Sequence, residues 1–241
     1  VAMGTIDGGA FTLAALSEAL SIPLFQIYEM PFIFNDDREA DYVMDKTFDF
    51  MAERLEKKGL VLIMWGTNGW RSFGTKGKPV QSPVDLKGLK MRSQESDVYV
   101  NFYKALSATP VPMATPEVVT ALKTGLVDGY DQTPVFSIST GWAGPNTCNY
   151  FTLSRHIYQP GAVVISKKLF NKLTDDQKAA LIPEAEERIN LTKNSRRLIR
   201  EDQAAVVGMM PDFNVKVVEL TKEQRAEFKK ATEPVYTTCL L

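Results

Sequence analysis

The chain has little of what most catalytic and metal sites are built from. Its 241 residues include two cysteines and a single histidine, His156. A zinc site or a hydrolase triad needs more such partners, and the motifs HExxH, GxSxG and CxxC do not occur. Cys148 and Cys239 could form a disulfide in an oxidising compartment, although two separate thiols are the simpler interpretation. We expect no catalytic residue, no bound metal and no enzymatic activity, because His156 alone is a poor basis for general acid–base work.

An excess of charge and a long apolar run are also missing. Lysine and arginine together number 28 and aspartate and glutamate 29, which gives a net charge of −1. This balance offers no attraction toward nucleic acid or an anionic membrane surface. No stretch approaches the ~18 consecutive apolar residues of a membrane span. Neither GxGxxG nor GxxxxGK[ST] occurs, so we predict no cofactor, no nucleic-acid partner and no stable membrane insertion.

The most informative part of the chain is residues 85–129, where the pattern predicts two consecutive strand–helix–strand units. Leu89 and Met91 alternate with polar neighbours, as in a half-buried strand, and apolar residues then return at helical spacing. Thr115 is predicted to cap the second helix and Gly125 to end it. Such units form a parallel sheet with a crevice at the carboxyl ends of the strands.

Arg92 stands where the first of these strands should end. A guanidinium at that edge presents a fixed fork of donors that matches a carboxylate bidentately. The alternative is an ordinary surface arginine whose stem lies along the end of a strand. The residues alone leave both interpretations open.

The remaining pattern is also that of an α/β protein. Asn35 is expected to cap one helix that runs to Gly59, and residues 60–65 form an apolar run typical of a buried strand. Thr174 opens a capping box and a long helical stretch that reaches about Val207, with an interruption near Pro183. Further strands are predicted at residues 149–153, 162–166 and 213–218, and a final helix begins at Thr221.

Several motifs together resemble one protein family. The family is that of the solute-binding proteins of TRAP transporters, the tripartite ATP-independent periplasmic carriers, of the DctP type. The motifs that carry the resemblance are MPFIFNDDREA, GTNGWRSF, DLKGLKMR followed by ATPVPMATPEVVTALKTGLVDG, and LSRHIYQPGAVVISKKLFNKLTDDQKAAL. They follow the order and spacing of the family, and the likeness covers nearly the whole chain.

The resemblance implies an α/β, two-lobed periplasmic-binding-protein architecture with hinge strands, a long helix spanning both lobes and a ligand cleft between the lobes. Lobe I would comprise residues 1–68 and 157–195, and lobe II residues 69–156 and 196–241. Against the family pattern, an N-terminal β-α-β unit and part of a C-terminal helix are expected to be missing or shortened.

The resemblance also implies which residues bind the ligand. Arg92 matches the arginine that clamps the ligand carboxylate, and Arg71 matches a second arginine near the ligand, with a structural salt bridge as its alternative. Asn68 is either a ligand contact or a turn residue, and Thr115 has a capping role that needs no ligand. One of the side chains in the irregular YDQT stretch is expected to contact the ligand. The full set of candidates is Arg92, Arg71, Asn68, Gln132, Asp131, Tyr130, Thr133, Thr115 and Thr12.

The function implied is capture of a small organic acid outside the cytoplasm, in the periplasm, and its delivery to the membrane permease subunits of a TRAP transporter by a monomeric protein. Two alternatives remain at this stage. One is the ligand-binding module of a sensor. The other is an enzyme acting on a small carboxylic acid with Asp131 or Glu117 as base, which lacks a second convergent acid, a metal cluster or a histidine pair.

Overall fold

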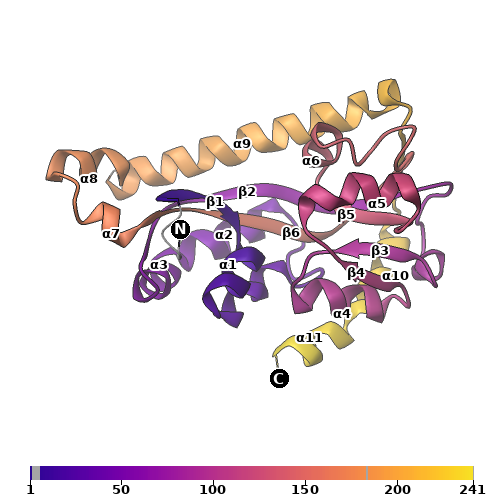
Figure 1. Ribbon diagram of the computed structural model, residues 1–241, viewed down its shortest axis with the longest axis horizontal. Helices are drawn as coiled ribbons and strands as arrows, with labels where there is room; N and C mark the ends of the chain where they lie inside the picture. Colours follow the sequence, from indigo (N-terminus) through magenta and orange to yellow (C-terminus); the bar gives the residue numbers. More distant parts are fainter. Residues whose placement is uncertain (2–5, 183, 241) are drawn as a thin grey trace. The chain divides into compact units, whose positions relative to one another are not determined.

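The computed structural model describes residue 1, residues 6–182 and residues 184–240. The chain divides into two compact units, and neither is a continuous stretch of sequence. Unit 1 comprises Val1–Glu29, Phe34–Asn68 and Gln159–Arg200, and unit 2 comprises Met30–Ile33, Gly69–Tyr158 and Glu201–Leu241. Two strands, β2 (Leu60–Thr75) and β6 (Tyr150–Ser166), and one helix, α9 (Ala185–Met209), contain residues of both units (Figure 1).

Unit 1 combines helices with the first half of β2 and the second half of β6. Strand β1 pairs antiparallel with the second half of β6, with Ala10 opposite Val163. Thr12 ends β1 and caps the following helix, because its side chain accepts a hydrogen bond from the Ala15 amide. Apart from the shared elements, unit 1 contains β1 (Gly8–Thr12), α1 (Leu13–Leu20), a 3-10 segment (Pro23–Glu29), α2 (Asp37–Lys46), α3 (Phe48–Lys57), α7 (Lys167–Phe170) and α8 (Asp175–Leu181).

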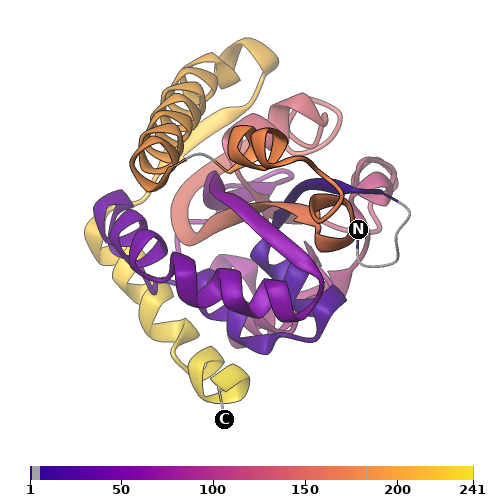
Figure 2. The ribbon, with the colours of Figure 1, turned by 90° about the vertical axis from the view of Figure 1, so that its left-hand side faces the viewer.

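The helix predicted between Asn35 and Gly59 is two helices. Asp36 rather than Asn35 is the cap, since its carboxylate accepts from the Glu39 amide at 2.9 Å. Thr47 separates α2 from α3, and its hydroxyl donates to the Val43 carbonyl at 2.7 Å, a local bond that competes with helix propagation. Gly59 ends α3 as predicted, with a φ of +81° that favours glycine, and Figure 2 shows the chain turning from α3 into β2.

An ion-pair ladder fastens the unit 1 portion of α9 to α2. Arg196 is 2% exposed and lies 2.9 Å from Asp45 and 3.3 Å from Asp41. One turn further along α9, Arg200 reaches Asp41 at 2.7 Å and Asp37 at 3.2 Å. The three aspartates recur every four residues, so they share one face of α2 and match the turn spacing of the arginines.

Unit 2 contains the two predicted strand–helix–strand units, and its sheet is parallel there as expected. Strand β3 (Lys90–Ser93) pairs parallel with β4 (Thr109–Pro112) and with β5 (Gly129–Gln132), and β5 pairs antiparallel with β2. Its other elements, apart from the shared ones, are η2 (Pro83–Leu86), α4 (Asp97–Ala105), η3 (Thr115–Glu117), α5 (Val118–Thr124), α6 (Pro134–Ser139), η4 (Met210–Phe213), β7 (Lys216–Glu219), α10 (Lys222–Thr232) and α11 (Pro234–Leu240).

Two further details of the sequence-based assignment are corrected. Ala114, not Thr115, precedes the 3-10 turn before α5, and it makes no side-chain cap, so Thr115 lies inside that turn. The strands predicted at 149–153 and 162–166 are the two ends of the single strand β6. Gly125 and the capping boxes of Thr174 and Thr221 are as predicted.

Two apolar cores lie on the two faces of the unit 2 sheet, one toward α5 and one toward α4 (Figure 1). Successive residues of a strand point to opposite faces. Met91 accordingly packs with Phe102 of α4, whereas Arg92 is in register with Tyr130 and lies against Trp142 on the α5 side. Asp131, the next residue of β5, contacts Tyr103 of α4. The sheet therefore places Arg92 and Asp131 on different faces.

Candidate functional site

Arg71 lies in strand β2 with its side chain fully buried in unit 2. Its Nε donates to Asp131 Oδ2 at 2.5 Å, and its Nη2 donates to the Asp131 carbonyl at 2.5 Å. Its Nη1 donates to Gln132 Oε1 at 3.2 Å. The guanidinium carbon also stands 4.6 Å from the centre of the Tyr99 ring, a favourable position for a cation. All three nitrogens of the guanidinium are thus engaged by β5.

Asp131 is the anion at the centre of this arrangement. Its Oδ1 accepts from the Tyr103 hydroxyl at 2.7 Å, and its Oδ2 lies 3.3 Å from His156 Nε2 in addition to Arg71. Burial raises the pKa of a carboxyl group, but the Arg71 charge and these hydrogen bonds outweigh it and hold the pKa of Asp131 far below its usual range. Asp131 is therefore ionised at every physiological pH.

His156 completes the network from strand β6. Its ring is stacked near Phe73 and Phe102, with centroid separations of 4.4 Å and 4.6 Å. Its Nδ1 lies 2.7 Å from the Ser154 hydroxyl. Burial lowers the pKa of His156 more than the neighbouring Asp131 carboxylate raises it, so the imidazole is neutral at pH 7. His156 is thus held by hydrogen bonds and ring contacts inside unit 2.

Arg92 has a different environment. It is 4% exposed, its Nη2 donates to the Met113 carbonyl at 3.0 Å, and its guanidinium carbon lies 5.0 Å from the centre of the Trp142 ring. Its Nε is buried and has no hydrogen-bond partner within the described part of the chain. Burial and then repulsion from Arg71 lower the pKa of Arg92 to about 10, which leaves it charged at pH 7. A buried guanidinium with an unused donor can accept an anion as its partner.

Residues 130–133, which look irregular in the sequence, are the end of strand β5 and the residue that follows it, and they are buried throughout. The ring of Tyr130 meets that of Trp142 edge to face, with centroids 5.1 Å apart. Gln132 Oε1 accepts from both Arg71 and the Thr133 amide, the latter at 2.8 Å. The segment thus holds Arg71 in place with Asp131 and Gln132, and the rigid strand β5 supports it.

Three other candidates do not belong to this cluster. Asn68 is exposed in unit 1, where its amide donates to Gln159 Oε1 at 3.3 Å. Thr12 is the cap of α1 in unit 1. Thr115 is exposed in the 3-10 turn before α5. Their contact with a ligand stays a prediction.

Sequence reasoning missed the aromatic side chains that support the two arginines. Tyr99 and Tyr103 lie four residues apart on α4, so they share the face that meets Arg71 and Asp131. Trp142 lies in the core and supports the guanidinium of Arg92 with its ring. The signal available in the sequence was the helical spacing of these two tyrosines, which come soon after a strand that ends in arginine.

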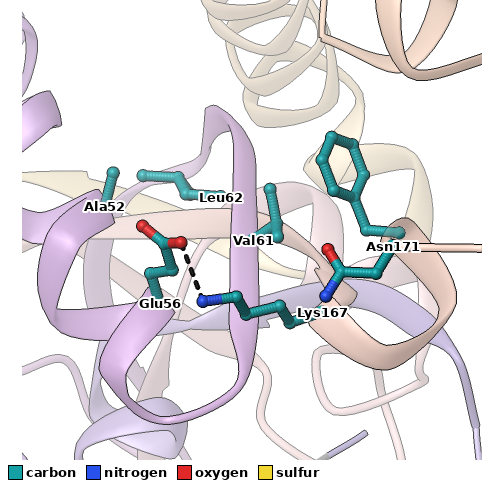
Figure 3. Close-up of a pocket in the computed structure, with 7 residues that line it drawn as sticks. Ala52, Glu56, Val61, Leu62, Lys167 and Asn171 are labelled. Carbon is teal, nitrogen blue, oxygen red and sulfur yellow. Dashed lines mark ion pairs between the residues drawn. The ribbon is translucent and has the colours of Figure 1, made fainter. Parts of the chain in front are cut away.

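A separate pocket of about 260 Å³ lies in unit 1 and is a weaker candidate. Glu56 of α3 and Lys167 of α7 face each other across it at 2.9 Å, with Val61 and Asn171 beside them (Figure 3). The two side chains are largely exposed and neutralise each other, so they leave no buried charge for an ionic ligand. Unit 2 has a shallow surface pocket of about 550 Å³ along α5, lined mainly by apolar and hydroxyl side chains.

Neither a metal site, nor a disulfide, nor a membrane-spanning helix is found among the described residues. No group of histidine, cysteine, aspartate and glutamate side chains there could hold a metal ion. Cys148 and Cys239 are free thiols, and Cys148 is buried. Among the helices described, none is long and apolar enough to cross a membrane.

Arg71 and Arg92 are buried on β2 and β3, the two strands that flank β5, which suits a protein that binds an anionic solute, and comparison with known proteins gives the class of solute-binding proteins. Residues 1–240 of the chain match the profile of the bacterial extracellular solute-binding proteins, family 7, DctP, and the chain belongs to that family.

Curated and solved relatives agree with this assignment. The 2,3-diketo-L-gulonate-binding periplasmic protein YiaO of Escherichia coli is 33% identical over 221 residues, which cover 89% of this chain. The TRAP periplasmic solute-binding protein of Chromohalobacter salexigens with bound D-glucuronate superposes with a TM-score of 0.89 at 27% identity, covering 99% of this chain and 77% of the other. That of a Sulfitobacter species with bound β-D-galacturonate gives 0.88 at 29% identity, with the same two coverages.

The matched region of YiaO is 64% of its length, so the chain spans less than two thirds of that curated relative. The solved relatives place the fold in the two-lobed TRAP solute-binding architecture that the sequence predicted. The prediction of the family from four short motifs is confirmed.

Proposed function

We propose that this protein binds a small organic acid outside the cytoplasm and delivers it to the membrane subunits of a TRAP transporter. The observation that carries the proposal is Arg92, a buried cation at the end of β3 whose Nε has no hydrogen-bond partner among the described residues. A carboxylate would supply both the missing acceptor and the missing negative charge.

The ligands named for the relatives support this class of compound. The two solved relatives hold D-glucuronate and β-D-galacturonate, and the curated relative is named for 2,3-diketo-L-gulonate. Each of these compounds is a carboxylate that also carries neutral oxygen groups. The proposal extends this class to our chain, in which Arg92 would clamp the carboxylate while polar groups read the remainder.

The other site assignments are part of the same proposal. Side chains within 130–133 and Arg71 would lie near the ligand from unit 2, and Asn68, Thr12 and Thr115 are the further candidates. The division into lobes that enclose the ligand, drawn at residues 68 and 157, remains a prediction. We also propose that the protein acts in the periplasm, as a monomer, and that it releases its ligand unchanged.

A thermal-shift screen of the purified chain against a library of organic acids tests the proposal. At least one acid should raise the unfolding temperature, since a ligand that binds only the folded state stabilises it. Isothermal titration calorimetry then gives the affinity, and native mass spectrometry shows any acid retained from expression. A chain that retains no acid and responds to none in the library would refute the proposed function.

A further inference from the structure

The charges buried around the candidate site do not balance. Within unit 2, three buried side chains are ionised and act on one another electrostatically, although the sheet separates Arg92 from the other two: Arg71, Arg92 and Asp131, all at most 4% exposed. His156 and Tyr103 touch this group but are neutral at pH 7, because burial lowers the pKa of the imidazole and raises that of the phenol. Two positive charges and one negative charge leave a single net positive charge.

The negative charge is committed to Arg71. Asp131 Oδ2 lies 2.5 Å from Arg71 Nε, and the backbone carbonyl of the same aspartate takes Arg71 Nη2. The other carboxylate oxygen is occupied by the Tyr103 hydroxyl at 2.7 Å. The charge of Arg71 is therefore neutralised within the fold. The guanidinium donors that could have bound a second carboxylate face β5 instead.

Arg92 carries the charge that is left over. The Trp142 ring stabilises a cation by its face but supplies no counter-charge. The Met113 carbonyl takes one donor, and the Nε has no hydrogen-bond partner in the part of the chain that is described. One ligand carboxylate satisfies the Arg92 guanidinium. A second carboxylate on the same ligand would lose its hydration and find no cation to pair with.

We propose that the site selects acids with a single carboxylate and otherwise uncharged polar groups, and that Asp131 sets this limit by neutralising Arg71. The inference rests on the proposed function, since it specifies which organic acids Arg92 accepts. It makes Asp131 a specificity-determining residue that acts through Arg71 without touching the ligand carboxylate.

The test is calorimetry with paired acids of two to six carbons, such as 2-hydroxybutyrate with malate and D-gluconate with D-glucarate. The members of each pair differ by one terminal carboxylate. At pH 7.5 the monoacid of every pair that binds should bind at least tenfold more tightly than its diacid. In Asp131→Asn, which frees the Arg71 charge, this preference should fall at least tenfold, whereas Glu95→Gln, an exposed charge removal nearby, should keep it.

A second measurement uses the unaltered protein, in case Asp131→Asn does not fold. Carboxyl groups have pKa values of about 4–5. Lowering the pH from 7.5 to 4.5 therefore protonates the distal carboxylate of many malate molecules, while Asp131 stays ionised. Binding of malate relative to 2-hydroxybutyrate should then rise.

Two results would count against the inference in different ways. Diacids that bind as tightly as their monoacids at pH 7.5, with both lost in Arg92→Ala, would refute the single-carboxylate rule and leave the proposed function intact. A panel in which neither monoacids nor diacids bind would refute the proposed function itself, and the inference with it.

Discussion

Arg71 and Asp131 form a salt bridge of 2.5 Å in which both side chains have no exposed surface. Such a pair contributes little net stability compared with apolar side chains of the same size, because both charges have lost their hydration. Replacing only one of the two residues destabilises the protein, since the surviving charge would stay buried without a partner. The pair therefore fixes the local geometry of β2 and β5 and constrains which substitutions unit 2 tolerates.

Replacing Asp131 with asparagine should destabilise the protein by about 3–5 kcal/mol, the usual cost of leaving a buried charge unpaired. Chemical denaturation at pH 7 measures this loss. Glu95→Gln removes an exposed carboxylate and should change stability by less than about 0.5 kcal/mol. Equal effects of the two substitutions would show that Arg71 does not depend on Asp131.

The same carboxylate gives a pH dependence of known sign. The pKa of Asp131 is depressed in the folded state, so its contribution is fully present above the unfolded value of ~3.9 and is lost as the pH falls below it. Stability should fall more steeply below pH 4 in the wild type than in Asp131→Asn. Denaturant midpoints between pH 5 and pH 2 for the two proteins check this, and parallel curves would contradict it.

Replacing Arg92 with alanine should abolish binding of any organic acid that the screen identifies. Truncating one partner of a buried charge pair costs about 2–5 kcal/mol, or roughly 30-fold to several thousand-fold in affinity. Calorimetry measures the loss, and circular dichroism confirms that the variant folds. Lys90→Ala, an exposed cation in the same strand, should bind normally. Micromolar binding by the Arg92 variant would overturn its assignment as the clamp.

His156 should make stability depend on pH below about 7. Its pKa is lowered in the folded state, so below the unfolded value of ~6.5 the unfolded chain binds more protons and stability falls as the pH falls. The loss is about 1.4 kcal/mol per pH unit until the folded-state pKa is reached. Because His156 is the only histidine, His156→Gln should lack this slope, and an unchanged slope would show the imidazole to be charged in the folded protein.

Arg196→Ala should destabilise unit 1 by about 1–3 kcal/mol, since it removes buried charge-assisted hydrogen bonds from the ladder to Asp41 and Asp45. Lys193, exposed on the same helix, provides the matched control, and Lys193→Ala should be close to neutral. The two variants are compared by urea denaturation. Equivalent midpoints would mean that the ladder is not coupled to the stability of the unit.

Alanine at two glycines should have opposite effects. A Cβ at Gly74 would overlap the Tyr130 ring, so Gly74→Ala should cost about 1–3 kcal/mol through overpacking. Gly208 lies in α9 with nothing close to an added Cβ, and Gly208→Ala should gain up to about 1 kcal/mol of helix propensity. Thermal unfolding of both variants decides the sign, and a stable Gly74→Ala would show that the ring moves freely.

Much of the fold of unit 2 could be predicted because its signals are local. Residues 85–129 alternate between strand and helix periodicity, and Gly125 marks a helix end by its left-handed backbone. The break at Thr47 could not be predicted in this way. The break depends on the hydrogen bond that the Thr47 hydroxyl donates to a nearby carbonyl, and threonine is also tolerated within many helices. The sequence predicts two strands in place of β6, because Pro160 and Gly161 are typical of a break between strands.

The candidate site divides along a similar line. Arg92 could be singled out because an arginine at a strand end is visible in the sequence. The engagement of Arg71 by Asp131 could not, because 60 residues separate them and the register of β2 against β5 brings them together. The role of Trp142 likewise depends on a loop conformation that no periodic pattern describes.

Neither compact unit is a continuous piece of the chain, and this affects the order of events during synthesis. Unit 1 needs residues up to Arg200, and unit 2 needs Glu201 onward, so neither can be completed while much of the chain is still being made. A domain encoded in one block can fold as soon as it emerges. Here a nascent chain stopped at residue 150 would hold fragments of both units, and separately expressed halves would have to find each other before either could fold.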